Sequence, residues 1–256
     1  MNLVHKLCLS GIALLCLGQP MVTGQIVNIE NKRIATDSAG WFGKARLSFA
    51  GSKNTKETFA LAANTLIEYK SKSSKDLWLL ISDISLITGD KEKFSNAGFG
   101  HLRYNRKFGE TIRWEVFTQI QYNSLTKVDR RVLFGTGPRF KLTQLEKAKF
   151  YFGVAYMYER EDLIEPIIRL RDHRISSYFT FTLLPEDEVS FTSTIYVQPL
   201  IEDASDYRLS SETTLTLGIT KKLNLAMSLR YGFDSMPPLG VPKSIYAFAN
   251  SIEVEF

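Results

Sequence analysis

From Trp41 to the end of the chain, apolar and polar side chains alternate with a period of two. Successive side chains of a β-strand point to opposite faces, so this alternation is typical of strands with one apolar and one polar face. Helical spacing, with apolar residues every three or four positions, is almost absent. The pattern therefore predicts an all-β domain.

About twelve alternating segments follow one another in this region. The segment TIRWEVFTQIQYN sets Ile112, Trp114 and Ile120 on one face against Arg113 and Glu115 on the other. The third segment, LWLLISDISLI, is apolar on both faces in its first half. The alternation predicts about twelve strands, with the exact bounds of each left open.

The connections between these segments alternate in length. KFGET, QLEKA, LPEDE and KKL are short turns, whereas the intervening connections, such as LIEPIIRLRDH and DSMPPLGVPK, are mostly longer. Short turns at one end and long loops at the other are typical of an outer-membrane barrel. An even number of strands places both chain ends on the short-turn side, which is the periplasmic side of such a barrel.

Two features favour a membrane barrel over a soluble sandwich or a lipocalin-like barrel. The apolar face is rich in aromatic residues near the strand ends, which are typical of the interfacial girdles of membrane barrels. These are Trp41, Tyr69, Trp114, Tyr122, Tyr231 and Tyr246. The other face carries charges in mid-strand, which in a dry sandwich would cost several kcal/mol each unless well paired. We therefore expect a closed antiparallel transmembrane β-barrel of about 12 strands over residues 41–256.

The last strand ends the chain on SIEVEF, with Ile252, Val254 and Phe256 alternating against polar residues. A chain end in a soluble domain usually frays, so a strictly alternating, aromatic-terminated tail indicates a strand held to its last residue. This ending resembles the signal read by the outer-membrane barrel assembly machinery. That machinery and the outer-membrane lipid bilayer are the expected partners, and the cell outer membrane is the expected location.

The N-terminus carries the pattern of a secretory signal peptide over residues 1–24. Lys6 precedes an uncharged apolar run, and small residues precede Gln25; the run is too short to span a bilayer as a helix. Cys8 and Cys16 both lie in this segment, so the mature chain contains no cysteine. Residues 25–40 show no sustained period and are predicted to form a periplasmic linker or a short plug.

The chain has a formal net charge of +5. A basic protein raises the question of a nucleic-acid partner, but Lys and Arg are spread along the whole chain without a dense basic block. We expect no nucleic-acid partner.

A family resemblance accompanies this pattern. The stretch WFGKARLSFAGSKNTKETFALAANTLIEY, with Trp41, Gly43, Gly51, Asn54 and Thr55, resembles the opening of the salt-induced outer-membrane protein family, a YdiY-like domain of unknown function. The stretch RRVLFGTGPRFKL is similar to a second recurrent segment of that family. The resemblance implies an outer-membrane location and a barrel architecture, and it implies no catalytic residues.

Candidate enzyme and metal chemistry is sparse. An outer-membrane lipid hydrolase requires a Ser within hydrogen-bond reach of a His base. After residue 24 the only histidines are His101, with Arg103 two positions later, and His173, which is placed in the loop RLRDHRISS with Ser176 three positions later. The acidic stretches GDKEKF and EDASDY lack the spacing of a calcium loop. We expect no enzyme, no cofactor and no metal site, and we expect the glycines of GFGHLR and FGTGPR to serve close backbone approach or a bulge.

Transport is the most concrete function that the sequence indicates. The candidate lumen-lining residues, all on the polar face, are Arg46, Arg103, Arg113, Glu115, Arg139, Lys141, Glu212 and Arg230. A net-basic lining favours small anions, because charges of one sign bias ion entry. The expected function is passive passage or binding of small solutes, in particular anions. Two alternatives stay open: a structural, envelope-stress or surface-interaction barrel whose lumen is filled by paired charges, and a lipid-modifying enzyme.

Overall fold

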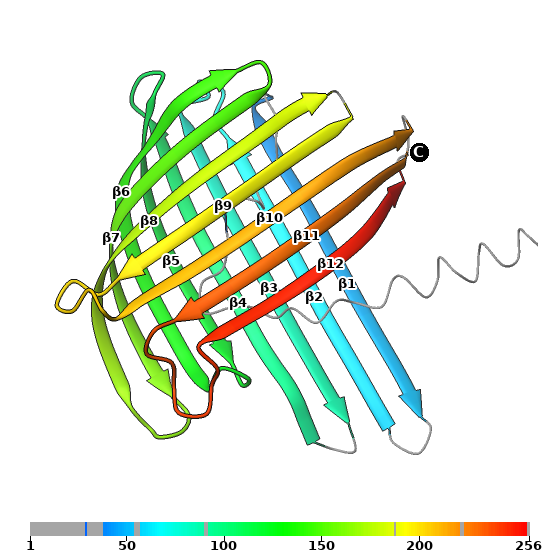
Figure 1. Ribbon diagram of the computed structural model, residues 1–256, viewed down its shortest axis with the longest axis vertical. Helices are drawn as coiled ribbons and strands as arrows, with labels where there is room; N and C mark the ends of the chain where they lie inside the picture. The colour runs from blue at the N-terminus through cyan, green and yellow to red at the C-terminus, as the bar shows by residue number, and fades with distance from the viewer. Residues whose placement is uncertain are drawn as a thin grey trace, which may run out of the picture.

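The computed structural model describes residue 29 and residues 38–53, 57–89, 92–186, 188–220 and 223–254. It contains twelve strands in a single sheet and confirms the all-β prediction (Figure 1). The strands are β1 (Gly40–Lys53), β2 (Glu57–Lys70), β3 (Asp76–Gly89), β4 (Glu92–Lys107), β5 (Ile112–Asn123), β6 (Val128–Leu145), β7 (Ala148–Leu163), β8 (Arg169–Glu186), β9 (Val189–Pro199), β10 (Tyr207–Thr220), β11 (Leu223–Asp234) and β12 (Ser244–Val254). In the described part of the chain no helix is long and apolar enough to cross a membrane.

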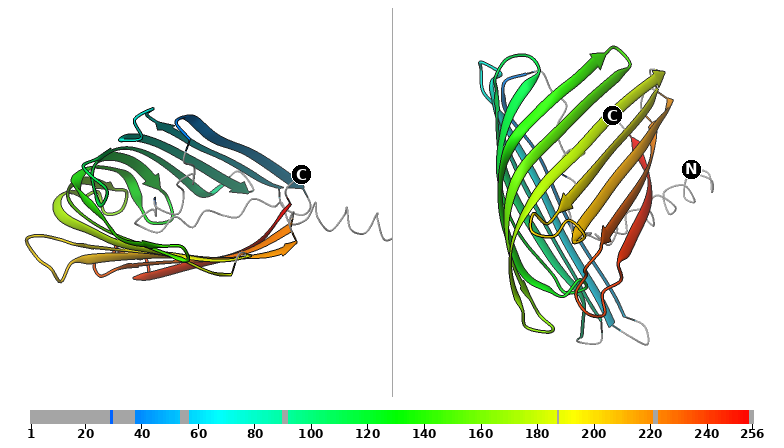
Figure 2. Two further views of the ribbon diagram at one scale, coloured as in Figure 1. Left: turned by 90° about the horizontal axis from the view of Figure 1, so that it is seen from above. Right: turned by 60° about the vertical axis from the view of Figure 1, so that its left-hand side comes forward.

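Each strand pairs antiparallel with the next along the chain, so the spatial order is the sequence order from β1 to β12. Figure 2 shows the sheet curling until its two edge strands, β1 in blue and β12 in red, face the same side of the molecule. The connection between β6 and β7 is residues 146–147, whereas residues 235–243 join β11 to β12 at the other end. From β6 onward the strands are thus joined by short turns at the end where β1 begins and by longer connections at the opposite end, whereas β3 and β4 are joined at that opposite end by residues 90–91 alone.

Several strands extend further than the sequence pattern predicts. The stretch LIEPIIRLRDH, expected to be a loop, is strand except for residues 164–168, because β7 continues to Leu163 and β8 begins at Arg169. His173 therefore lies in β8 and not in a loop. Charged side chains at these strand ends pair across the sheet, so their polar sequence resembles a loop although the backbone is fully paired.

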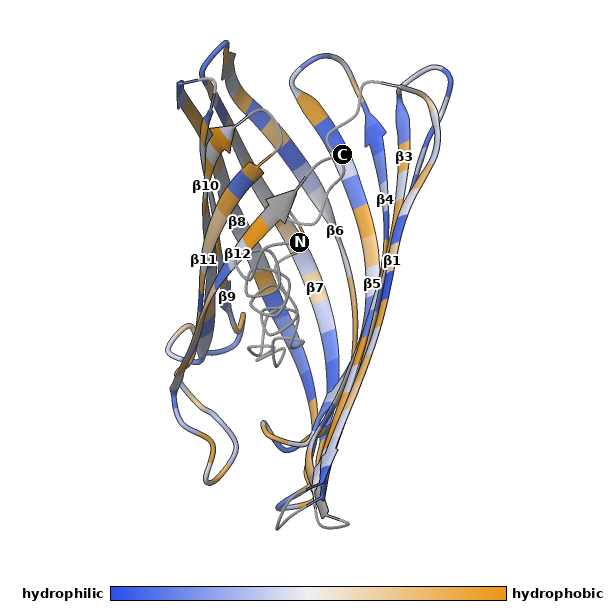
Figure 3. Cartoon of the chain, turned by 90° about the vertical axis from the view of Figure 1, so that its right-hand side faces the viewer, coloured by the Kyte–Doolittle hydropathy of each residue, from blue (hydrophilic) through white to orange (hydrophobic). Residues whose placement is uncertain are grey.

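The two faces of the sheet have inverted polarity. The side chains of Arg103, Glu115 and Arg131 on the concave face are 1–3% exposed. On the convex face Ile120 and Phe134 are 54% and 49% exposed. Figure 3 shows the resulting alternation of hydrophilic and hydrophobic bands along the strands. Burial of charge and exposure of large apolar side chains is the reverse of what a water-soluble domain shows.

A row of aromatic side chains crosses the first four strands on the convex face. Trp41 of β1 lies opposite Tyr69 of β2, which lies opposite Trp78 of β3 and then Tyr104 of β4. The ring centroids are 4.8 Å apart in the first pair and 4.6 Å apart in the Trp78–Tyr104 pair. The row lies close to the short-turn end of the sheet.

The predicted signal peptide, residues 1–24, lies outside the described residues. Of the predicted linker or plug, the structure describes Ile29 and residues 38–40. Ile29 is 2% exposed and packs on the concave face against Leu79, Ile81 and Phe99. Of the predicted assembly signal, Ile252 is exposed in β12 and Val254 is the last residue of that strand, while Phe256 lies outside the described residues.

Candidate functional site on the concave face

A polar group lies near the centre of the concave face. Arg103 Nη1 is 3.3 Å from Glu115 Oε2, and the guanidinium of Arg139 is 3.8 Å from Glu115 Oε1. The hydroxyl of Tyr178 donates to the same carboxylate at 2.8 Å. Arg139 also stacks over the ring of Tyr151, 4.3 Å from its centroid. One carboxylate from β5 thus binds two arginines and a tyrosine from β4, β6 and β8.

His101 continues this group along β4 and β5. Arg103 Nε donates to His101 Nε2 at 3.3 Å, so Nε2 accepts, and Nδ1 is left to donate to Gln119 Oε1 at 3.0 Å. The imidazole lies between the rings of Phe99 and Phe117. Both ring nitrogens of His101 are therefore engaged in a neutral, buried side chain, which makes it a structural residue of this face.

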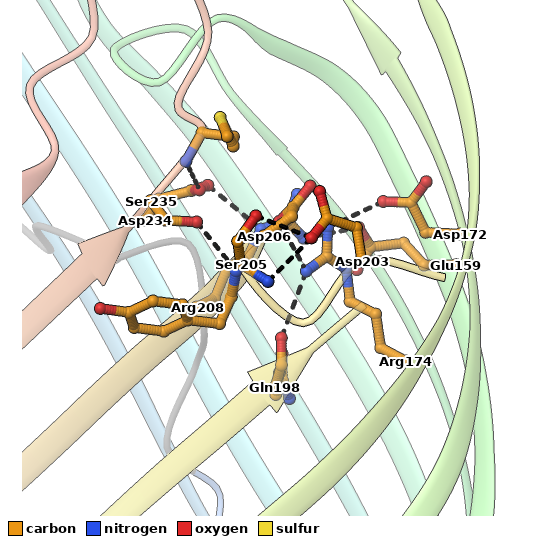
Figure 4. Close-up of polar contacts among 12 residues, drawn as sticks. Glu159, Asp172, Arg174, Gln198, Asp203, Ser205, Asp206, Arg208, Asp234 and Ser235 are labelled. Atoms are coloured by element: carbon orange, nitrogen blue, oxygen red, sulfur yellow. Dashed lines mark hydrogen bonds and ion pairs between the residues drawn. The ribbon is translucent and has the colours of Figure 1, made fainter. Parts of the chain in front are cut away.

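A second, larger charge cluster lies toward the end with the longer connections. Arg208 of β10 is its hub: Nη1 donates to Glu159 and Nε donates to Asp234 at 3.1 Å (Figure 4), and Nη2 donates to Glu161 at 2.9 Å. All four side chains are 5% exposed or less. Three carboxylates from β7 and β11 thus share one guanidinium from β10.

Arg131 and Arg174 complete this cluster. Arg131 Nη2 donates to Glu161 at 2.7 Å, so Glu161 joins β6, β7 and β10. Arg174 donates from Nη2 to Asp172 at 2.9 Å and from Nη1 to Asp206 at 3.0 Å. Five carboxylates face three guanidiniums in these contacts, so this end of the concave face is not basic.

The connection next to this cluster is held by its own hydrogen bonds. Asp203, in the segment between β9 and β10, accepts from the hydroxyl of Ser205 at 2.7 Å and from its backbone N–H at 3.0 Å. These hydrogen bonds, the hydroxyl first, hold the pKa of Asp203 below its usual value. They order the turn that leads into Arg208.

All eight candidate lumen-lining residues lie on the concave face, but in four different settings. Arg103, Glu115 and Arg139 are buried in the central group, whereas Arg113 and Lys141 are half-buried toward the short-turn end. Glu212 and Arg230 pair at 3.4 Å with the guanidinium 46% exposed. Arg46 is exposed on the edge strand β1, opposite Asn64.

Sequence reasoning did not single out most of the larger cluster. Arg131, Glu161, Arg174, Arg208 and Asp234 were missed, although each is buried and paired. Arg174 and Asp234 lie in stretches that the pattern assigned to loops, Arg208 lies between two predicted segments, and Arg131 and Glu161 are end residues of predicted strand segments. The alternation itself was the available signal, because Arg131 and Glu161 fall on the polar face of β6 and β7.

A small cavity of about 30 Å³ opens between the two charge clusters. It is lined in part by His101, Arg103, Glu159, Tyr196 and Gln198, together with Ile29. That volume holds about one water molecule.

The histidine and serine considered for hydrolase chemistry lie on opposite faces of the sheet. His173 lies on the convex face, where Tyr156 contacts its Nδ1, and Ser176 is buried on the concave face, where it accepts from Gln198. The two residues lie on opposite faces of β8, so they do not form a nucleophile and base pair. Within the described ranges no group of three or more His, Cys, Asp or Glu side chains is arranged to hold a metal ion.

Comparison with protein-family models identifies the family to which this chain belongs. A family model described as "Protein of unknown function, DUF481" matches residues 42–256. The chain belongs to this family. The match spans all twelve strands except the first two residues of β1, and it confirms the expected membership of a family of unknown function. No curated protein matches the chain.

Two solved structures are similar to this chain. A NanC porin is 12% identical, with a TM-score of 0.47, and the match covers 82% of this chain and 100% of the porin chain. A bacterial polysaccharide outer membrane secretin is 11% identical, also with a TM-score of 0.47, and the match covers 85% of this chain and 86% of that chain.

Proposed function

We propose that this DUF481 protein is a barrel of the bacterial outer membrane in which β1 pairs with β12 and the convex face contacts lipid. The observation that carries the proposal is the inverted polarity of the sheet. Exposed Ile120 and Phe134 favour contact with hydrocarbon, while buried Arg103, Glu115 and Arg131 favour an interior position. Closure removes the two free edges, whose unpaired backbone groups would cost several kcal/mol each in lipid.

The aromatic row from Trp41 to Tyr104 supports the orientation of this barrel. Trp and Tyr side chains are enriched at the membrane–water interface, where the ring contacts apolar chains and the polar atom contacts water. The row lies near the short-turn end, which in outer-membrane barrels is the periplasmic end. Both chain ends then lie in the periplasm, as expected after cleavage of a signal peptide.

We further propose that the interior passes or binds small solutes, in particular anions, without catalysis. A strip of basic side chains follows the concave face at the short-turn end: Lys107, Arg113, Arg139, Lys141 and Lys149. Rings of one charge sign bias which ions enter a pore. The strip supports anion preference, while the carboxylate-rich cluster around Arg208 sets the opposite bias at the other end.

Ion selectivity in planar bilayers tests this function. Under a KCl gradient the reversal potential of residues 25–256, refolded and inserted, is expected to indicate anion preference. Replacing Arg103, Arg113 and Arg139 together by Gln is expected to reduce that preference, and Arg106→Gln, an exposed arginine on the convex face of β4, serves as the control. An unchanged reversal potential in the triple variant contradicts the assignment of these arginines.

A barrel with a filled interior is the second candidate, and one observation favours it. The cluster of Arg131, Arg174 and Arg208 with their carboxylates is almost completely buried, and the cavity beside it holds about one water. A protein that inserts into the bilayer yet passes no current supports this structural or envelope-stress role.

A further inference from the structure

Four arginines gather on the convex face at the rim that carries the longer connections. Arg130 of β6, Arg160 of β7, and Arg169 and Arg171 of β8 all occupy outward positions of neighbouring strands. The side chains of Arg130 and Arg169 are 53% and 73% exposed. The convex positions of the flanking strands β5, β9 and β10 carry no charged side chain. The four arginines therefore form a local patch, which we call the arginine rim.

One carboxylate, that of Asp162, contacts three of the four arginines of the arginine rim. Asp162 Oδ2 accepts from Arg130 Nη2 at 2.8 Å, while its Oδ1 is 3.5 Å from Arg169 Nε and 3.7 Å from Arg160 Nε. Nearby, Asp129 follows Val128 in β6, and Glu165 pairs with Lys127 in the adjoining connections. Basic groups outnumber acidic groups at this rim.

The strand register concentrates the excess of positive charge at one position of the rim. Arg160 and Arg171 are direct cross-strand partners on the same face. Like charges directly opposite each other destabilise a sheet unless a counter-charge lies between them. On the concave face, Arg113 and Arg139 are also cross-strand partners, but there Glu115 lies against Arg139 as a counter-charge. At the convex rim, Asp162 contacts Arg160, whereas Arg171 has no carboxylate partner among the described residues, so an anion from outside the chain would complete this pair.

The position of the rim indicates which anion it binds. Tyr158 and His173 are paired at the preceding outward position of β7 and β8, about 7 Å along each strand. Aromatic side chains at the edge of an apolar band lie at the headgroup level of a membrane. The arginines one and two outward positions further on then lie at the level of lipid phosphates. Guanidinium groups bind phosphate through paired hydrogen bonds.

We propose that the arginine rim binds the phosphate groups of an anionic glycolipid in the outer leaflet, with Arg160 and Arg171 sharing one phosphate. This inference rests on the proposed membrane position of the barrel. The ligand is held from the membrane side and not from the lumen, so binding is independent of any solute passing through the interior.

Lipid binding by the refolded residues 25–256 in neutral detergent tests the proposal. The probes are diphosphorylated lipid A, the same lipid without phosphates, and inorganic phosphate. Wild-type protein is expected to bind the diphosphorylated lipid at least about tenfold more tightly than the phosphate-free lipid. The double variant Arg160→Gln, Arg171→Gln is expected to lose most of this difference. Arg106→Gln, an arginine on the convex face at the opposite rim, is the matched control and is expected to bind as wild type does.

Three results would overturn the proposal: equal binding of the two lipids, wild-type affinity in the double variant, or displacement of the lipid by millimolar inorganic phosphate. The last would identify a free-phosphate site. If the double variant does not fold, the affinities of wild-type protein for the two lipids decide by themselves whether the proposal holds. Heat-modifiable migration after insertion into vesicles reports separately on the barrel. An inserted barrel that does not discriminate the lipids contradicts only the arginine rim.

Discussion

The hydroxyl of Tyr178 donates to Glu115 Oε2 at 2.8 Å, although two strands lie between β8 and β5. In a flat sheet these strands would be about 14 Å apart. Two glycines on the concave face make the contact sterically possible. A Cβ on Gly153 would lie 2.2 Å from Cε1 of Tyr178, and a Cβ on Gly137 would lie 2.0 Å from the backbone oxygen of Val154. The curvature of the sheet and the central polar group thus depend on each other.

The Tyr178–Glu115 hydrogen bond is expected to contribute measurably to stability. Tyr178→Phe removes the donor and leaves a buried carboxylate with one partner fewer, which should lower the free energy of unfolding by about 1–3 kcal/mol. Tyr246→Phe, whose ring is 75% exposed on the convex face, is the control and should change it by less than about 0.5 kcal/mol. Urea unfolding in lipid vesicles measures both. Equal stabilities of the two variants would count against a structural role for this bond.

Because β6 and β7 approach closely at Gly137, a side chain at this position is expected to destabilise the protein. Gly137→Ala places a methyl group against the backbone of Val154 and Ala155, which should destabilise the barrel by at least about 2 kcal/mol. Gly51→Ala is the matched control, because there a Cβ meets only Thr58 O at an ordinary 3.8 Å. Folding yield and urea midpoints of the two variants test the difference, and a Gly137→Ala protein as stable as wild type would contradict the packing described here.

The hub role of Arg208 predicts a large effect of its removal. Arg208→Met leaves Glu159, Glu161 and Asp234 buried with less compensation, and the free energy of unfolding should fall by about 3–5 kcal/mol. Arg230→Met breaks the more exposed pair with Glu212 and should cost less than about 1 kcal/mol. The comparison is made by equilibrium unfolding, and similar losses for both variants would argue against Arg208 as the hub.

Closure of the barrel predicts that β1 and β12 are neighbours in the membrane. Residues 25–256 contain no cysteine, so cysteine pairs can be introduced without background. Ala45→Cys combined in turn with Tyr246→Cys, Phe248→Cys or Asn250→Cys should give at least one cross-link on mild oxidation in vesicles. Ala45→Cys with Thr65→Cys, register partners in β1 and β2, is the positive control. A cross-linked control without any β1–β12 cross-link would contradict closure.

Much of the fold could be predicted from the alternation alone. The period of two predicted about twelve strands and the face on which each side chain lies. In β5, for example, it separated Ile112 and Trp114 on the apolar face from Arg113 and Glu115 on the polar face. The glycines of FGTGPR were likewise expected to serve close backbone approach, which Gly137 confirms. These features follow from local geometry, because the pleat of a strand fixes which side chains share a face.

The pairing of charges could not be predicted in the same way. Arg131 and Arg174 lie in stretches whose polar composition resembles loops, and Asp234 opens the stretch DSMPPLGVPK. Their place in the sheet depends on register, and register depends on turn geometry and on partners far along the chain. Glu115 was identified as a lining residue, yet its contact with Tyr178 follows only from the curvature of the whole sheet.

The central claim, that the convex face contacts lipid and the concave face lines the interior, is tested most directly at two adjacent residues of β1. Arg46 and Leu47 are both exposed, so a spin label at either position disturbs no packing. In vesicles, a label at Leu47→Cys is expected to be accessible to oxygen from the bilayer, and a label at Arg46→Cys to a water-soluble nickel reagent. The same aqueous accessibility at both positions would contradict the account.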